Sequence, residues 1–179
     1  ALTSAVESLH SLTGLPLGVV MARDLVPRLT NEKVVVAGIP LSCRKWHLRD
    51  PVRGEQCRSG ARKLFTLDWR KGLSFSTCAM GFDTFACPIL RDDRLEAILF
   101  GHGFFLDKRP DDENIISLIS GYGIDQREYF SDLEDVRVFS MEAVRVIAAS
   151  AAKVIEAVLT SNSDGRWANG ERPWASEDP

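Results

Sequence analysis

Two apolar runs in the middle of the chain decide the fold: residues 84–90 (TFACPIL) and residues 95–105 (LEAILFGHGFF), joined by the polar residues 91–94 (RDDR). A short polar link between two apolar runs is typical of an antiparallel hairpin. The second run is apolar on both faces, which predicts a central strand of the sheet. Within it, Gly101 and Gly103 would leave room beside the backbone.

The segments around this hairpin alternate between helical and extended patterns. Helical spacing of apolar residues predicts helices at 5–12 and 56–71, from Asp111 and from Ser140, whereas 18–21 and 33–39 are β-branched and predict strands. This order favours an α+β fold, an antiparallel sheet flanked by helices, over a doubly wound parallel sheet. The last helix, 140–160, is the longest and carries a wide apolar stripe.

Composition indicates one domain followed by a polar segment. The chain has 179 residues, of which 45% are hydrophobic and 26% charged, with a net charge of −3. We therefore expect a single domain at 1–160, and a linker or tail at 161–179, where the sequence is polar and lacks a period. No apolar run approaches the ~20 residues needed to span a bilayer, and no export signal begins the sequence, so we expect a cytoplasmic location.

Four cysteines are the first candidates for chemistry: Cys43, Cys57, Cys78 and Cys87. A reducing compartment makes disulfides a poor expectation. No CxxC pair is present, so the spacing alone indicates a metal only weakly. The residues leave three alternatives open, which are small buried hydrophobic side chains, thiolate ligands of zinc or an iron–sulfur cluster, and redox-sensitive thiols.

The histidines offer little support for catalysis. His47 follows Cys43 closely, so a nucleophilic Cys–His pair is formally conceivable, but no nucleophile elbow, phosphate-binding loop or paired carboxylates accompany it. We therefore predict that the protein is not an enzyme. His102 lies inside the apolar strand and is better interpreted as a polar anchor in a ligand pocket.

Charge is unevenly distributed along the chain. Residues 44–71 hold nine Lys or Arg against Asp50, Glu55 and Asp68, a local charge of +6 that leaves the remainder at −9. A nucleic-acid-contacting module is one interpretation of this basic segment. We favour the alternative, a solvated helix face with its preceding loop, because no aromatic interleaving or nucleic-acid motif accompanies the charges. Direct contact with nucleic acid is therefore not expected.

Several motifs in order resemble the PocR sensory-domain family. They are SLTGLPLGVV, LSCRKW…GEQCRSGARK, STCAMGFDTFACPILRDDRLEAILFGHGFF and GYGIDQREYFSDLEDVRVFSMEAVRVIAASAAKVIEAV, and together they span most of 13–159. Cys43, Cys57 and Cys78 stand where the family has cysteines. Ala79 stands where histidine is common in the family, and Cys87 is an addition to the usual three.

The resemblance implies a PAS/GAF-like ligand-binding domain of bacterial signalling and transcription regulators. Such a domain binds a small organic molecule and signals through a C-terminal helix to an effector such as a DNA-binding module or a histidine kinase. It also strengthens the hypothesis of a zinc or iron–sulfur site at Cys43, Cys57, Cys78 and Cys87, because four thiols complete a Cys₄ site. A homodimer through the 140–160 helix is a further expectation.

The candidate ligand-binding residues are bulky or polar side chains on the central hairpin and on the segments that face it. They are Trp46, Phe75, Phe85, Phe100, His102 and Phe104.

Overall fold

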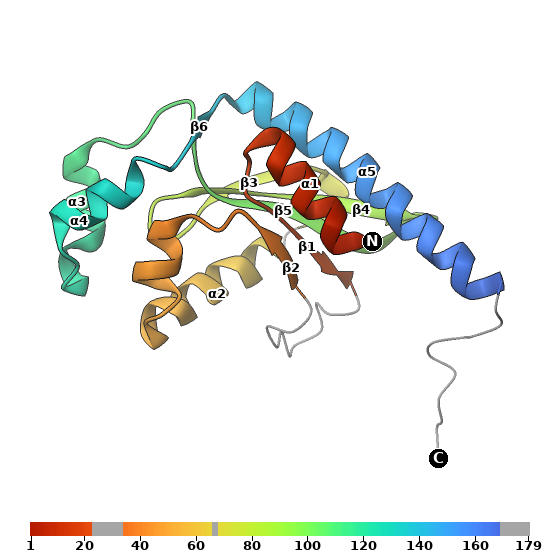
Figure 1. Cartoon of the computed structure of the whole chain (residues 1–179), viewed down its shortest axis with the longest axis horizontal. Helices are drawn as coiled ribbons and strands as arrows, with labels where there is room; N and C mark the ends of the chain where they lie inside the picture. The colour runs from red at the N-terminus through yellow and green to blue at the C-terminus, as the bar shows by residue number, and fades with distance from the viewer. Residues whose placement is uncertain (23–33, 66–67, 169–179) are drawn as a thin grey trace, which may run out of the picture.

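The centre of the computed structural model, which describes residues 1–22, 34–65 and 68–168, is an antiparallel sheet (Figure 1). Its strands run in the order β2–β1–β5–β4–β3, and every neighbouring pair in that order is antiparallel. A sixth strand, β6 (Val138–Phe139), pairs in parallel with the end of β5. The other bounds are β1 (Leu17–Met21), β2 (Val34–Ala37), β3 (Ser74–Thr77), β4 (Asp83–Arg91) and β5 (Arg94–Leu106).

The predicted central hairpin is confirmed as the β4–β5 pair, with β5 in the middle of the sheet. Its turn is tighter than the four-residue link expected, because Arg91 pairs with Arg94 and only Asp92 and Asp93 remain between the strands. Both aspartates have positive φ, 49° and 58°. This is the backbone geometry of the two-residue hairpin turns whose twist matches that of the strands.

Helices cover both faces of the sheet and one of its ends (Figure 1). Helices α1 (Leu2–Thr13) and α5 (Met141–Ala168) lie on one face and α2 (Pro51–Phe65) on the other, while α3 (Asp112–Ile119) and α4 (Gln126–Leu133) lie at the end. The expected α+β fold with a PAS-like antiparallel sheet, flanking helices and a long C-terminal helix is therefore confirmed.

Several of the expected element boundaries differ from the structure. The helix predicted at 56–71 begins earlier, at Pro51, and ends at Phe65, and a short turn of 3₁₀ helix, η4 (Trp69–Lys71), precedes Gly72. Residues 66–67 and 169–179 lie outside the described residues. Ser140 caps α5 as predicted, since its Oγ accepts a hydrogen bond from the Ala143 N–H at 3.1 Å. The helix continues past Thr160, where the tail was expected to begin, to Ala168.

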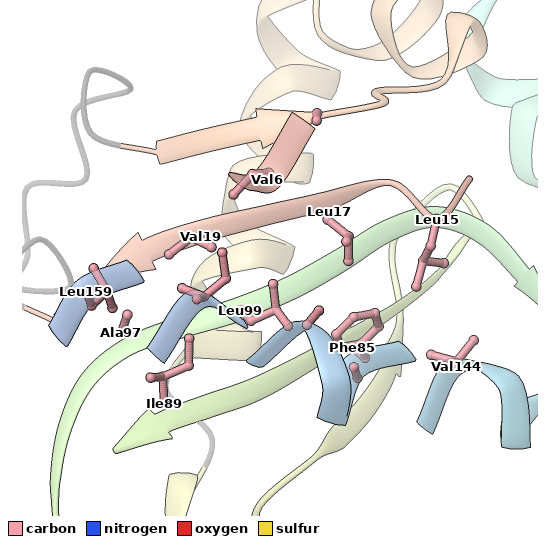
Figure 2. Close-up of a cluster of buried hydrophobic side chains, with 14 of the residues drawn as sticks. Val6, Leu15, Leu17, Val19, Phe85, Ile89, Ala97, Leu99, Val144 and Leu159 are labelled. Carbon is pink, nitrogen blue, oxygen red and sulfur yellow. The ribbon is translucent and has the colours of Figure 1, made fainter. Parts of the chain in front are cut away.

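The largest core cluster lies between the sheet and the pair α1 and α5, as Figure 2 shows. Strand side chains such as Leu17, Phe85 and Leu99 are fully buried there against Val6 of α1 and Val144 of α5. A smaller cluster on the opposite face contains Val20, Ala86, Ile98 and Phe100. A third cluster lies among the short π-helical turn η3 (Cys43–His47), α3, α4 and the β3–β4 turn.

The two glycines of β5 admit close neighbours, as the sequence predicted. A Cβ at Gly101 would lie 2.1 Å from Cε1 of Phe85, and a Cβ at Gly103 would lie 2.6 Å from Cγ of Pro40. Gly103 also has a positive φ, 73°, and the pairing of β4 with β5 shifts at this point. Because a bulge adds one residue, Phe104 points to the α5 face rather than to the face of His102.

Among the described residues, no helix combines the length and the apolar character that crossing a membrane requires.

Candidate functional site

The six candidate ligand-binding residues lie in three different places. Phe85 and Phe104 are fully buried in the core under α5. Phe75 packs against that core, where the guanidinium of Arg145 on α5 lies 5.3 Å from its ring centre. These three side chains fill the core, so the structure does not bring all six into one pocket.

Phe100 and His102 lie together on the opposite face of the sheet, the face that α2 covers. Their ring centres are 5.8 Å apart. Phe100 lies over Gly18, where a Cβ would be 2.3 Å from Cζ of the ring. His102 is partly buried, and burial lowers its pKa from 6.5 to about 4. The imidazole is therefore neutral at physiological pH.

Trp46 belongs to a third place, a short turn of π-helix, η3 (Cys43–His47), at the end of the sheet. The Leu48 N–H donates to the Cys43 carbonyl at 2.9 Å, the five-residue step that defines this rare helix. One turn closes over about five residues, so Ser42, Cys43 and His47 lie on one side. Ser42 and His47 are fully buried, whereas Arg44 and Leu48 are exposed.

Three side chains of η3 attach it to α4. His47 Nε2 lies 3.2 Å from the hydroxyl of Tyr129, itself buried. Trp46 Nε1 donates to Asp132 Oδ2 at 2.6 Å, and Lys45 Nζ lies 3.0 Å from the same oxygen. Since Asp132 is only 9% exposed, its carboxylate depends on these two donors for its solvation.

Cys43, Cys57 and Cys78 are brought toward this turn from three separate elements. Cys43 belongs to η3, Cys57 to α2, and Cys78 follows β3. Burial raises the pKa of Cys43 most, and the charges of Cys78 and Cys57 raise it further. Burial also raises the pKa of Tyr129, and the charges of the same three cysteines raise it further. Such effects require the three thiols and the phenol to be near one another, and we name Ser42, Cys43, His47, Cys57, Cys78 and Tyr129 the η3 cluster.

Four members of the η3 cluster are neutral at physiological pH: His47, Cys43, Cys78 and Tyr129. Burial lowers the pKa of His47 from 6.5 to about 4, and the positive charge of Arg53 acts in the same direction. Burial also raises the pKa of Cys78, so this thiol, like Cys43 and the Tyr129 phenol, keeps its proton. Arg53 is itself paired, with its Nη2 3.4 Å from Asp50 Oδ2 and its Nη1 donating to the Tyr122 carbonyl at 3.0 Å.

Among the described residues, the buried His47 Nδ1 has no hydrogen-bond partner, and the buried Ser42 Oγ has only a weak one. The Ser42 hydroxyl does contact the Cys43 thiol, where it opposes the rise of the pKa of Cys43, but a thiol is a weak hydrogen-bonding group. An unpartnered buried polar atom costs about 1–3 kcal/mol. The cluster therefore has unused capacity for hydrogen bonding.

Cys87 is separated from the other three cysteines. It lies on β4 and packs against the core under α5, whereas Cys43 and Cys78 pack against the cluster that contains α3 and α4. From Asp83, just past the β3–β4 turn, to Cys87 the strand advances by about 13 Å. Sulfurs bound to one zinc lie within about 4.6 Å of one another. As the side chains stand in the described part of the chain, no three His, Cys, Asp or Glu residues are grouped to hold a metal ion.

The basic segment 44–71 is partly engaged within the protein. Lys45 pairs with Glu128 at 2.5 Å and with Asp132, and Arg53 pairs with Asp50. Arg70 stacks on Trp69, with 4.3 Å between the guanidinium carbon and the ring centre. Several cations of this segment therefore already make contacts within the protein.

A shallow depression of about 540 Å³ opens at the β4–β5 turn, away from all the candidate residues. It is lined by Arg91, Asp92, Arg94, Leu95 and Glu96.

Sequence analysis did not select Ser42, His47 or Tyr129 as site residues. The proximity of His47 to Cys43 in the sequence was a usable signal, because both lie in one turn. Ser42 is an ordinary loop serine by sequence, and Tyr129 lies in a polar segment that was not predicted to be a helix. Only the tertiary contact between η3 and α4 reveals their importance.

Comparison with known protein families places the chain among sensory domains. The family model described as the sensory domain found in PocR matches residues 1–163. The chain therefore belongs to the PocR sensory-domain family, as the motifs predicted. No curated protein and no solved structure matches the chain.

Proposed function

We propose that this domain binds a small organic ligand at its buried polar cluster and relays the binding event through α5 to an effector module. The observation that carries the proposal is the η3 cluster, which joins separate chain segments around buried polar atoms that have weak hydrogen bonds or none among the described residues. Ligand pockets combine apolar surroundings with a few polar groups that orient the ligand. Phe100 and His102 are candidates for the continuation of such a site along the sheet.

Two routes connect the η3 cluster with the start of α5. The first runs through α4, which holds η3 by way of Tyr129 and Asp132 and ends only eight residues before Met141. The second runs along β5. Cys43 Sγ would lie 3.8 Å from a Cβ at Gly103, and Asp107 at the end of that strand accepts a hydrogen bond from the Met141 N–H at 3.0 Å. A ligand that favours one arrangement of η3 would thereby bias the packing of α5.

The proposal assigns the domain to binding rather than to catalysis. Burial raises the pKa of Cys43 and Cys78, and a protonated thiol is a poor nucleophile. The four cysteines form no disulfide, which fits a reducing compartment and supports a cytoplasmic location.

A thermal-shift and calorimetric screen of short alcohols, amines and carboxylates against the whole chain tests the ligand. Binding would raise the melting temperature with ligand concentration. Hydrogen exchange with and without the best compound tests the relay. We expect changed protection at residues 141–150. If no compound stabilises the protein even in large excess, the proposal is contradicted.

A second candidate is a thiolate metal site at Cys43, Cys57 and Cys78, favoured by the mutual effect of these cysteines on the pKa of Cys43. Metal binding would have to draw the thiols together and displace their protons, so it would weaken as the pH falls. Elemental analysis after anaerobic purification and titration with Co²⁺ test it. Thiolate-to-cobalt absorption that Cys43→Ser abolishes and Cys87→Ser preserves would support the site, whereas no absorption with wild-type protein would exclude it. A redox sensor is less favoured. Oxidants attack the thiolate, and burial raises the pKa of Cys43 and Cys78 so that these thiols keep their protons.

We further propose that two copies of the chain pair through α5. The sheet-facing stripe of this helix is buried, but Val146 and Val154, eight residues apart on another side, are 57% and 44% exposed. Pairing would cover these side chains and align the two chains where they leave the domain.

A further inference from the structure

We propose that α2 is a movable cover over the η3 cluster, and that Tyr122 is the residue that holds this cover closed. This inference rests on the proposed sensory function and deepens it, because it adds the route by which a molecule from solvent reaches the buried cluster. The short helical turn η5 (Ser120–Tyr122), which carries Tyr122, joins α3 to the segment before α4.

The η3 cluster is closed to solvent in this structure. Ser42 and His47 are each 0% exposed, and Tyr129, whose hydroxyl lies 3.2 Å from His47 Nε2, is buried as well. A molecule reaches such a site only after an element beside it moves. Two helices adjoin η3, namely α4, which holds it through Tyr129 and Asp132, and α2, which contacts it from the other side of the chain.

Of these two helices, α2 is the one with the weaker attachment. Helix α4 buries Tyr129, Asp132 and Leu133. Among the α2 residues whose burial the structure describes, Gly54 alone is buried, and Val52 is 68% exposed. Packing of an apolar face supplies most of the stability of a helix in a protein, so the helix with fewer buried side chains opens at the lower cost in free energy. We therefore expect α2 to move and α4 to stay in place.

Polar contacts with Tyr122 hold the first two turns of α2. The Tyr122 hydroxyl donates to Gln56 Oε1 at 3.1 Å, and the Tyr122 carbonyl accepts from Arg53 Nη1 at 3.0 Å. The guanidinium carbon of Arg53 also lies 5.7 Å from the centre of the Tyr122 ring. Asp50, the other partner of Arg53, immediately precedes α2 and would move with it. Tyr122 thus ties α2 to a separate part of the chain.

Arg53 and Cys57 connect these contacts with the η3 cluster. Burial lowers the pKa of His47 and the charge of Arg53 lowers it further, which requires the guanidinium to be near the imidazole. Cys57, one turn beyond Arg53, adds to the rise that burial and Cys78 cause in the pKa of Cys43. Movement of α2 away from Tyr122 would withdraw both side chains from the cluster and open it to solvent.

Thiol labelling measures this opening without any ligand. The whole chain is treated with N-ethylmaleimide, and the modification of each cysteine is followed by mass spectrometry, with hydrogen exchange at residues 51–57 recorded in parallel. Cys43 and Cys57 report on the movement of α2. Cys87 packs against the core under α5 and is the internal control for unfolding of the whole domain.

Two variants should open the cover to different degrees. Gln56→Ala removes one exposed hydrogen bond, so labelling of Cys43 and exchange at residues 51–57 should become about threefold faster. Tyr122→Ala also removes the ring from Arg53, and we expect these rates to rise about tenfold. In both variants Cys87 should react at the wild-type rate.

Ser120→Ala is the matched control, because the Ser120 hydroxyl donates to the Ser117 carbonyl at 3.0 Å, within its own segment rather than to α2. It should label and exchange like wild type. Equal acceleration at Cys43, Cys57 and Cys87 would mean that Tyr122 stabilises the domain as a whole, and it would overturn the inference. Unchanged rates at Cys43 and Cys57 in Tyr122→Ala would overturn it as well.

Either of these results leaves a sensory domain whose ligand enters by another route, since the ligand screen tests the sensory function separately. If Tyr122→Ala opens α2 as expected but no compound stabilises the wild-type chain, the cover is retained and its sensory role is removed. The two proposals can therefore fail independently.

Discussion

Gly101 shows how one residue type controls the packing of the central strand. A Cβ there would lie 2.1 Å from Cε1 of Phe85, whose ring is fully buried under α5. Gly101→Ala must push this ring out of a close-packed core, and we expect it to lower the free energy of unfolding by about 1–3 kcal/mol. Urea denaturation monitored by circular dichroism measures the change.

Gly60 in α2 is the matched control for Gly101, because none of the described atoms from other parts of the chain lies within 4 Å of the position that its Cβ would take. Alanine is a better helix former than glycine, so Gly60→Ala should raise the free energy of unfolding by about 0.5–1 kcal/mol. If both variants unfolded at the same urea concentration, the predicted clash between a Cβ at position 101 and the Phe85 ring would be contradicted.

The lowered pKa values of two histidines predict how stability depends on pH. Burial lowers the pKa of His47 and of His102 from 6.5 to about 4. Between these values the unfolded chain takes up a proton at each histidine and the folded protein does not. Stability is therefore full above pH 6.5 and falls as the pH drops toward 4, by about 1.4 kcal/mol per pH unit for each histidine.

His102→Asn isolates one of the two contributions. Urea denaturation of wild type and variant at several values between pH 6.5 and 5, above the range where most carboxylates titrate, should show about half the wild-type slope in the variant. Equal slopes for the two proteins would mean that His102 is as easily protonated in the folded state as in the unfolded chain.

At this scale, residue identities alone could not reveal the site. Cys43, Cys57 and Cys78 fit a pattern of family cysteines, but nothing in their spacing separates them from Cys87. The separation arises because Cys87 lies inside β4, on the face of the sheet that α5 covers. Phe104 illustrates the same limit, since the bulge at Gly103 is a backbone feature that reverses which face the following residue occupies.

The contact between η3 and α4 is the element-scale feature most open to experiment. Asp132 accepts from Trp46 Nε1 at 2.6 Å and pairs with Lys45 at 3.0 Å, at an exposure of only 9%. Asp132→Ala leaves the partly buried Trp46 N–H without its acceptor, so we expect a loss of about 1–3 kcal/mol in the free energy of unfolding. Hydrogen exchange at residues 43–48 should become faster, because η3 would be held less firmly.

Glu128→Ala provides the control for Asp132, since Glu128 pairs with the same lysine but its side chain is 53% exposed. An exposed ion pair contributes about 0–1 kcal/mol, so this variant should exchange nearly as slowly as wild type at residues 43–48. Similar losses in the two variants would show that Trp46 and its hydrogen bond do not anchor η3.

Elements with a clear periodic pattern were predictable, and short or polar ones were not. The β4–β5 hairpin followed from two apolar runs and a polar link, and α5 from its long apolar stripe. In contrast, α4 is the mostly polar segment QREYFSDL, which its Asp125 cap and a few buried side chains hold as a helix. Strand β3 has only four residues and forms because it pairs with β4.

For the molecule as a whole, β5 is the element that unites the two layers and the polar cluster. One face of this strand contributes Leu99 to the core under α5, the other carries Phe100 and His102, and its end is bonded to β6 and to the start of α5. In the proposed relay, a change at η3 would therefore reach α5 through a strand that cannot slide without disturbing the main core. This arrangement favours a small rotation or repacking of α5 over a large displacement.

The proposed pairing of two chains through α5 makes the last prediction. This helix uses one side to cover the sheet, where Val144, Ala148 and Ile155 are fully buried, so its other side is available. Val146 and Val154 on that other side are about half exposed, and a glutamate at each would place charge in a paired surface. Sedimentation velocity at two protein concentrations should show a dimer for wild type and a monomer for Val146→Glu/Val154→Glu. Both should melt at similar temperatures if measured where wild type is monomeric, because neither valine belongs to the core.

Leu12→Glu is the matched control, since Leu12 on α1 is 84% exposed and lies outside the proposed surface. It should sediment like wild type. A wild-type protein that stays monomeric at both concentrations, or a double variant that still dimerises, would contradict pairing through α5. In either case the exposed valines would be ordinary surface residues, and the relay would have to act within a single chain.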